Sequence, residues 1–279
     1  MKPNIAILIL FYNKVAETIE CIDSFLPGGQ HIYILNNGSE SSSVQKIERR
    51  YSDDDKVHLI DFNENLGPAK GRNKLVSDST EEWLFFIDND ITIQPQKNWV
   101  EIFWACQSAN AEAKVFCPQL YNVYEKQIVK HPLFILNSGK IFLEPSRAAF
   151  GNYFPSGASI VHRSIFDTYG LFDDALFAFE DYEYAIRLLT KGIELKVVTV
   201  EGITLMHDHK YQKADVDKAA VKARYNEEKL QHSFNHMQAE HNVVFEHDWE
   251  WWSRKQVSDM TADPIFKKIK SGLKRLIGK

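Results

Sequence analysis

Short apolar runs alternate with amphipathic segments along the first third of the chain. Each run is nearly continuous in hydrophobic residues, as in strands that are buried on both faces of a sheet. Each intervening segment repeats its apolar residues every three or four positions, as on one side of a helix. This order predicts an α/β fold with a mixed, mostly parallel sheet flanked by helices. The predicted strands are Ile5–Leu10, Ile32–Leu35, Val57–Phe62 and Trp83–Ile87, and the predicted helices are Lys14–Phe25, Ser41–Tyr51 and Ala69–Val76.

The rest of the chain has a less regular pattern. Residues 121–150 show no clean period, and we expect loops and short strands there. A long polar helix is predicted from Asp215 to about Glu240. We therefore divide the chain into an α/β domain at 1–210 and a helical C-terminal extension at 211–279. Further strands are predicted at Lys114–Leu120, Ala158–His162, Leu195–Val200 and Ile203–His207, with a helix at Asp181–Thr190.

Charge is distributed unevenly along the 279 residues. The net charge of −5 argues against a nucleic-acid partner, yet residues 265–279 contain only basic charged side chains. On a helical wheel, the apolar residues of this segment fall on one side and the basic residues on the other. Such a helix is typical of proteins that lie on an anionic membrane, and docking on the protein's own acidic body is the alternative. The apolar side consists of Ile265, Phe266, Ile269, Leu273, Leu276 and Ile277.

The cysteines and the N-terminus indicate where the chain resides. Cys21, Cys106 and Cys117 show neither a disulfide pattern nor metal-ligand spacing, which favours a reducing compartment. The apolar run Ile5–Phe11 is too short for a secretion signal or a membrane span, and no other run reaches spanning length. We expect a cytoplasmic protein, soluble or peripheral on the inner face of the plasma membrane.

The first candidate for chemistry is Asp88-Asn89-Asp90, directly after an apolar strand. Two carboxylates one residue apart at the mouth of a buried strand can share a Mg²⁺ or Mn²⁺ ion, or divide their contacts between a cation and a ribose. A simple strand-ending turn would favour the same residue types. Asp88-x-Asp90-x-Thr92 also resembles the nucleophile motif of haloacid-dehalogenase-type phosphatases. That motif normally opens the first strand, however, and here three strand–helix units precede it.

The second candidate is the acidic start of the helix at Glu180, Asp181 and Glu183. Acids in the first turn of a helix are favoured by its dipole, and Glu183 can pair with Arg187 one turn later. One of these carboxylates could instead be a general base that takes a proton from an acceptor hydroxyl.

The third candidate is the pair His207 and His209, at the end of a predicted strand. A single histidine is most often structural, but a histidine at a strand end can join the Asp88–Asp90 carboxylates around a cation. We favour His207 as this ligand because it continues the strand directly, and His209 is the alternative.

Taken in order, these motifs resemble family 2 glycosyltransferases of the GT-A fold, which is Rossmann-like. The resemblance covers about residues 4–209 and is nearest to the rhamnosyltransferase-like branch that builds bacterial surface polysaccharides. It implies that 1–210 is a nucleotide-sugar-binding and catalytic domain. The motifs that carry it are Ile5–Asn13, Ile34–Ser39, Asn65–Asn73, Asp88–Asp90, Pro155–Asp173 and Glu180–Arg187.

The resemblance also implies residue roles. Asp181 would be the catalytic base with Glu180 beside it, while Asp90 and His207 would hold Mn²⁺ or Mg²⁺ with the donor diphosphate. Gly157 and Ala158 would leave room for the sugar. Nucleotide contacts would come from Phe11, Tyr12, Asn13, Asn36, Asn65, Gly67, Arg72, Asn73 and Asp88.

The implied reaction transfers a sugar, with inversion, from a nucleotide diphosphate sugar to an acceptor hydroxyl, in this branch that of a lipid-linked glycan. Two positions depart from the family pattern. Asn36 stands where an aspartate more often accepts the ring N–H of the base, and Glu183 replaces an aspartate. A non-catalytic sugar-binding module on the same fold is a further alternative. The sequence gives no indication of oligomeric state.

Overall fold

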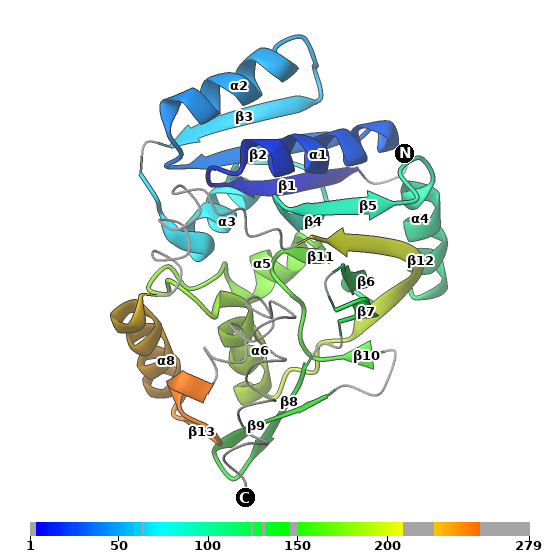
Figure 1. Ribbon diagram of the computed structural model, residues 1–279. Helices are drawn as coiled ribbons and strands as arrows, with labels where there is room; N and C mark the ends of the chain where they lie inside the picture. The colour runs from blue at the N-terminus through cyan, green and yellow to red at the C-terminus, as the bar shows by residue number, and fades with distance from the viewer. Residues whose placement is uncertain are drawn as a thin grey trace, which may run out of the picture.

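The computed structural model describes residues 4–62, 64–123, 125–129, 132–145, 150–208 and 226–251. A ten-stranded mixed sheet forms the centre of the molecule, with helices on both faces (Figure 1). Its strand order is β10-β12-β6-β11-β4-β1-β2-β3, with β5 paired to β12 and β7 paired to β6. The strands are β1 (Ile5–Phe11), β2 (His31–Asn37), β3 (Val57–Phe62), β4 (Trp83–Asp88), β5 (Ile91–Gln94), β6 (Val115–Asn122), β7 (Gln127–Ile128), β10 (Phe150–Gly151), β11 (Ala158–His162) and β12 (Val197–His207).

Most pairs among the long strands are parallel, as predicted. β1 pairs in parallel with β2 and β4, β2 with β3, and β6 with β12, whereas β11 is antiparallel to both of its neighbours. The predicted α/β class with a mostly parallel sheet is therefore confirmed. The helices are α1 (Val15–Phe25), η1 (Leu26–Gly28), α2 (Ser41–Tyr51), α3 (Gly67–Asp78), α4 (Trp99–Ala109), α5 (Ser164–Tyr169), α6 (Glu180–Thr190) and α8 (Glu227–His241).

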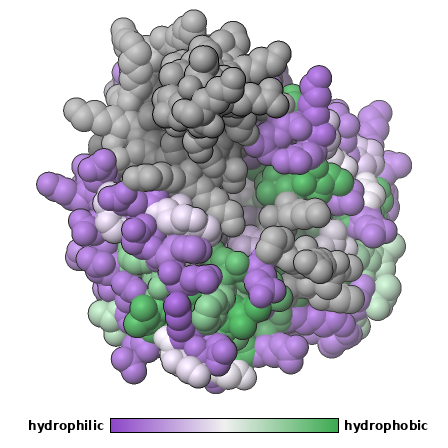
Figure 2. All heavy atoms as spheres, turned by 60° about the horizontal axis from the view of Figure 1, so that its bottom comes forward, coloured by the Kyte–Doolittle hydropathy of each residue, from purple (hydrophilic) through white to green (hydrophobic). Residues whose placement is uncertain are grey.

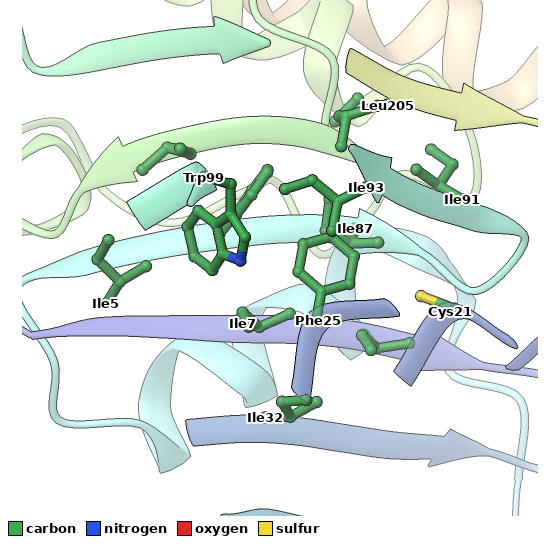
Figure 3. Packing of buried hydrophobic residues seen from close by; sticks show 14 of the residues in the cluster. Ile5, Ile7, Cys21, Phe25, Ile32, Ile87, Ile91, Ile93, Trp99 and Leu205 are labelled. Atoms are coloured by element: carbon green, nitrogen blue, oxygen red, sulfur yellow. The ribbon is translucent and has the colours of Figure 1, made fainter. Parts of the chain in front are cut away.

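Two hydrophobic layers pack on opposite faces of the sheet. In β1, Ile7 and Ile9 point to the layer built with α1, α2 and α4, and Ala6 and Leu8 point to the layer built with α3, α5 and α6. Figure 3 shows Phe25 of α1 and Trp99 beside the strand residues of the first layer. Burial on both faces explains why the strands are almost continuously apolar.

Some elements differ from the sequence pattern, and β12 and α4 are two of them. The predicted strands Leu195–Val200 and Ile203–His207 form one strand, β12, whose pairing with β6 shifts between Val200 and Thr204. Gly202 lies in this irregular part with a φ of +88°, a conformation that favours glycine. Helix α4 lies in a stretch for which the pattern predicted no element.

The described part of the C-terminal extension packs against the α/β domain. Helix α8 lies beside α6 (Figure 1), and β13 (Val244–Phe245) pairs with β9 (Lys140–Pro145) in a small second sheet completed by β8 (Pro132–Asn137). Short strands at 121–150 are thus confirmed. The long polar helix is confirmed only over its second half, because residues 209–225 lie outside the described residues.

Two histidines of α8 strengthen this packing. His236 Nε2 lies 2.7 Å from Asp173 Oδ2, and His241 Nε2 lies 2.8 Å from Glu183 Oε1. The amphipathic helix predicted at 265–279 also lies outside the described residues. Within the described ranges, no helix is both long and apolar enough to cross a membrane.

Candidate active site

The carboxyl ends of the parallel strands meet at one edge of the sheet. Phe11 at the end of β1 pairs in register with Asn36 of β2, and Asn36 pairs with Asp61 of β3. On the other side of β1, Leu10 pairs with Asp88. Since ligands of open α/β sheets bind at this edge, the polar residues gathered here form a candidate site.

Asp90 and His207, which we predicted to share a cation, are in contact. Asp90 directly precedes β5, and His207 ends β12, which pairs with β5. His207 Nε2 lies 3.2 Å from Asp90 Oδ1, and Lys14 Nζ lies 3.0 Å from Asp90 Oδ2. Burial opposes ionisation of Asp90, but His207 and Lys14 outweigh it and hold the pKa of Asp90 well below its usual range. Asp90 is therefore a carboxylate at neutral pH.

The spacing of this pair fits two neighbouring ligands of one divalent cation. With metal–ligand bonds of about 2.0–2.2 Å, adjacent ligands of an octahedral ion lie about 3 Å apart. Imidazole suits transition metals, and carboxylate suits Mg²⁺ and Mn²⁺, so the pair fits Mn²⁺ better than Mg²⁺. The described residues contain no group of three or more His, Cys, Asp or Glu side chains placed to hold a metal. This part of the chain thus offers two ligands, and substrate oxygens would have to complete the coordination.

Arg72 of α3 joins the two acidic clusters. Its Nη2 donates to Asp88 Oδ1 at 2.7 Å, its Nη1 donates to Glu180 Oε1 at 2.8 Å, and its Nε donates to the Ser156 carbonyl oxygen at 2.8 Å. Both the Arg72 and Glu180 side chains are nearly buried. Gly157 allows the Asp88 carboxylate to lie against the backbone, because a Cβ at this glycine would come within 2.3 Å of the Asp88 carboxyl carbon. Arg72 therefore positions the Asp88 and Glu180 carboxylates, and Gly157 leaves space for that of Asp88.

Asp181 occupies the first turn of α6, next to Glu180. Its Oδ2 accepts hydrogen bonds from the Tyr153 hydroxyl at 2.6 Å and from the Ser156 backbone N–H at 3.3 Å. Burial raises the pKa of Asp181 to about 7 and the Glu180 carboxylate adds to the rise, although Tyr153, Ser156 and Arg72 oppose it. A carboxylate with a pKa near neutrality is suited to accept a proton from a substrate.

The loops after β1 and β2 are joined by hydrogen bonds. The Asn13 backbone N–H donates to Ser39 Oγ at 2.9 Å, and Asn13 Oδ1 accepts from the Glu40 backbone N–H at 3.1 Å. Asn36 Oδ1 accepts from the Ser39 backbone N–H at 2.8 Å. The side-chain oxygens of Asn13 and Asn36 thus fix the shape of the rim where a nucleotide base was expected.

The loop between β3 and α3 lies against the end of β2. Asn37 Oδ1 accepts from the Leu66 backbone N–H at 2.8 Å, and Asn65 Oδ1 accepts from the Gly67 backbone N–H at 2.9 Å. Gly67 has a φ of +80° at the start of α3. Asn65 and Gly67 therefore lie at a helix N-terminus, where backbone N–H groups favour an anionic ligand.

Phe11 and Asn73, two of the residues predicted to contact the nucleotide, make their contacts inside the protein. Phe11 is completely buried in the core, whereas Tyr12, the next residue, is half-buried. The Asn73 amide donates to the Phe172 carbonyl oxygen at 2.8 Å and to Asp174 Oδ1 at 2.6 Å, and its oxygen accepts from the Phe172 backbone N–H at 3.0 Å. Asn73 thus ties α3 to the loop after α5.

Sequence reasoning did not identify Lys14, Tyr153, Ser156 or Asp61 as part of this edge. Lys14 meets Asp90 from 76 residues away, and Tyr153 meets Asp181 from 28 residues away. No local pattern marks such partners. The signal for Lys14 was its place shortly after the end of β1, and Asp61 is an acidic residue near the end of β3.

Comparisons with known proteins identify the family and the fold of the chain. A family model described as glycosyl transferase family 2 matches residues 6–170, more than half of the chain. The chain belongs to this family. Among solved structures, S. aureus TarS in complex with UDP-GlcNAc superposes with a TM-score of 0.57 at 13% identity, covering 86% of this chain and 73% of that chain. The structure of GalNAc-T7 with UDP, GalNAc and Mn²⁺ superposes with a TM-score of 0.59 at 12% identity, covering 94% and 58%. These likenesses show that the fold is the GT-A fold.

Two curated relatives match at higher identity. The chain is 25% identical over 210 residues to the dTDP-rhamnosyl transferase RfbF of Shigella flexneri, covering 71% of this chain and 67% of the relative. It is 24% identical over 166 residues to the pre-mycofactocin glycosyltransferase of Mycobacterium tuberculosis, covering 57% of this chain. The match spans about a third of the mycobacterial relative, 34% of its length.

Proposed function

We propose that the protein transfers a sugar, with inversion, from a nucleotide diphosphate sugar to an acceptor hydroxyl in a metal-dependent reaction. One observation carries this proposal. Arg72 binds Asp88 and Glu180 at once, so the acidic motif of β4 and the acidic motif of α6 belong to one site. Membership of the glycosyltransferase family and the UDP-sugar complexes of proteins with the same fold support it.

Asp90 and His207 are the proposed metal ligands at the donor side. A divalent cation held there would neutralise charge on the leaving nucleoside diphosphate. Lys14 Nζ lies 3.0 Å from Asp90 Oδ2 and would add a positive charge near the diphosphate oxygens. Asp88 would approach the ribose, and Asn65 and Gly67 would present the N-terminus of α3 to the phosphates. Tyr12 and Asn13 would form the wall of the base pocket with Phe11 and Asn36 behind them.

Asp181 is the proposed base at the acceptor side. It would remove the proton of the acceptor hydroxyl as the oxygen attacks the anomeric carbon opposite the leaving diphosphate. Tyr153 and Ser156 hold the Asp181 carboxylate in place, and Arg72 fixes Glu180 beside it. One base with no separate nucleophile gives a single displacement, and hence inversion. The phosphatase alternative loses support because Asp88, its nucleophile, is held by Arg72.

A transfer assay with a panel of nucleotide diphosphate sugars, with Mn²⁺, with Mg²⁺ and with EDTA, tests the proposal. We expect metal-dependent turnover of at least one donor. Asp181→Asn should lower turnover by about 10²–10⁴-fold while nucleotide binding is retained, because the variant removes only the proton acceptor. Turnover that persists in EDTA would contradict the metal assignment, and nucleotide-sugar binding without turnover on any acceptor would favour a binding module.

We further propose that the acceptor is a lipid-linked glycan and that the C-terminal segment 265–279 contacts the cytoplasmic membrane surface. The likeness to a rhamnosyl transferase supports a role in bacterial surface polysaccharide synthesis. The described end of the extension exposes two large hydrophobic side chains, Val244 (61%) and Trp251 (36%). Figure 2 turns the lower side of Figure 1 forward and shows hydrophobic side chains (green) among the hydrophilic ones (purple). We also propose that the chain consists of a catalytic domain at 1–210 and a C-terminal extension at 211–279.

A further inference from the structure

Three residues form one row across the carboxyl ends of the first three strands. Phe11, Asn36 and Asp61 are paired in register on β1, β2 and β3, so their side chains leave the sheet on the same face. Phe11 and Asn36 are buried, whereas Asp61 is exposed. The outermost member of the row is thus the carboxylate.

The amide of Asn36 is already engaged inside the protein. Its Nδ2 donates to Asp61 Oδ1 at 2.5 Å and to the Phe62 carbonyl oxygen at 3.2 Å. Its Oδ1 accepts from the Ser39 backbone N–H at 2.8 Å. Both amide protons are therefore used, and the oxygen is directed at the loop after β2.

These partners also fix the orientation of the amide. The Ser39 backbone N–H can only donate, so the side-chain oxygen must face it, and the NH₂ group then faces Asp61 and Phe62. An aspartate in place of Asn36 would put two carboxylates against each other, which raises the energy of the charged pair. Asn36 and Asp61 are thus a matched amide–carboxylate pair.

We propose that Asp61, and not the residue at the end of β2, is the carboxylate that recognises the base of the donor nucleotide. This inference rests on the proposed nucleotide-sugar function. Asp61 Oδ1 accepts a hydrogen bond from the Asn36 amide, and the described residues supply no partner for Oδ2. One carboxylate oxygen matches the single ring N–H that uracil and thymine present between two carbonyl groups. It matches cytosine poorly, because the corresponding ring nitrogen of cytosine is an acceptor.

Binding of UDP, dTDP, CDP and GDP in the presence of Mn²⁺, measured by calorimetry, tests this assignment. We expect the wild-type chain to bind UDP or dTDP at least tenfold more tightly than CDP. Asp61→Asn should weaken binding of UDP or dTDP at least tenfold. It should also reduce the difference in affinity between these nucleotides and CDP, since an amide can donate to cytosine. Asp54→Asn, which removes a carboxylate near the start of β3, is the matched control and should leave all four affinities unchanged.

The reciprocal variants probe the pairing itself. Asn36→Asp alone should weaken UDP or dTDP binding because it places a second carboxylate against Asp61. The double variant Asn36→Asp, Asp61→Asn restores one amide and one carboxylate but places the carboxylate at the end of β2, so it should recover thermal stability while UDP or dTDP binding stays at least tenfold weaker than in the wild type. Recovery of wild-type binding by the double variant would overturn the role of Asp61. Thermal unfolding of each variant shows whether the fold is retained.

The outcomes separate this inference from the proposed function. A wild-type chain that binds UDP or dTDP, with an Asp61→Asn variant that binds them equally well, overturns the role of Asp61 and leaves the glycosyltransferase proposal standing. A preference for GDP or CDP in the wild type overturns it also. A wild-type chain that binds none of the four nucleotides overturns both.

Discussion

At the residue scale, burial of Asp181 raises its pKa and the hydrogen bonds to it oppose the rise, so together they set the pH range in which it can act as a base. Its pKa of about 7 means that the carboxyl group is largely protonated below neutrality and ionised above it. Only the ionised form can accept a proton. The Tyr153 hydroxyl donates to this carboxyl group and stabilises its charged form. Burial and the nearby Asp181 charge raise the pKa of Tyr153 well above its usual value, so the phenol keeps its proton.

Transfer activity should accordingly rise with pH through about 7 in the wild type. Tyr153→Phe removes a hydrogen bond that lowers the pKa of Asp181, so the rise in activity should move to higher pH. The measurement is the pH profile of kcat/KM. Tyr33→Phe, at a tyrosine bonded to Glu81 away from the site, is the control and should leave the profile in place. A Tyr153→Phe profile that coincides with the wild-type profile would exclude this role for the hydroxyl.

The sequence could predict residues that follow strands, but not the partners that reach them from elsewhere. Asp88, Asp90 and His207 were identified because each ends or follows an apolar run, and parallel strands gather such ends. The contact of Lys14 with Asp90 depends on side-chain packing between loops 76 residues apart. Tyr153 was missed for the same reason, since it lies in a segment without a periodic pattern. The roles of all these residues in catalysis remain predictions.

At the element scale, hydrophobic periodicity identified the helices and strands that cover the sheet. Helix α2 and strands β3 and β11 have the predicted bounds, because each has a clear period and polar residues at both ends. The joining of two predicted strands into β12 could not be predicted from the sequence, because Glu201 and Gly202 interrupt the apolar run between them. Strand β6 pairs with β12 on both sides of the irregularity, and β5 pairs with it from Thr204 to His207.

The packing of α8 on α6 depends on a buried carboxylate in α6. Glu183 accepts from Arg187 Nε at 2.8 Å and contacts His241 Nε2 at 2.8 Å, and its side chain is 2% exposed. Burial disfavours its charge, but His241 and Arg187 outweigh burial and lower the pKa of Glu183. Glu183 is therefore ionised in the folded protein, with Arg187 and His241 as its partners.

Glu183→Gln should destabilise the protein by about 3 kcal/mol at pH 7, because it leaves the Arg187 charge without its buried partner. Since the folded-state pKa is lowered, the stabilisation by Glu183 is complete above the unfolded pKa of about 4.3 and is lost as the pH falls through the folded-state value. Urea unfolding should show that the free energies of unfolding of the wild type and of Glu183→Gln differ at pH 7 and become similar in acid. Asp78→Asn breaks the more exposed pair with Lys74 and should cost less than about 1 kcal/mol. Equal effects of the two variants would contradict the assignment.

At the scale of the whole molecule, the chain combines an acidic body with a basic end. The net charge is −5 although residues 265–279 carry only positive side chains. An anionic membrane attracts a basic segment by about 1 kcal/mol for each Lys or Arg near its surface. The placement of the active site at a membrane would then depend on charge as well as on apolar contact.

The 279-residue chain should therefore sediment with vesicles that contain anionic lipid, and added salt should release it. Replacing Lys267, Lys270 and Lys274 by Gln should weaken vesicle binding by about a hundredfold, from about 1 kcal/mol for each charge. Replacing Lys46, Lys56 and Lys97 in the α/β domain is the control for net charge. Binding that is equally strong on neutral vesicles would contradict the charge-based contact and leave only an apolar one.

The guanidinium of Arg72 has a consequence for the order of events in a reaction cycle. It bonds both Asp88 and Glu180, at the proposed donor and acceptor ends of the site, and its charge opposes the rise in the pKa of Asp181. A donor that draws Arg72 toward Asp88 would weaken its hold on Glu180 and alter the field at Asp181. Binding of the donor would thereby change the pKa of Asp181 through Arg72. Asp181 would then be adjusted to accept a proton once a leaving group is bound.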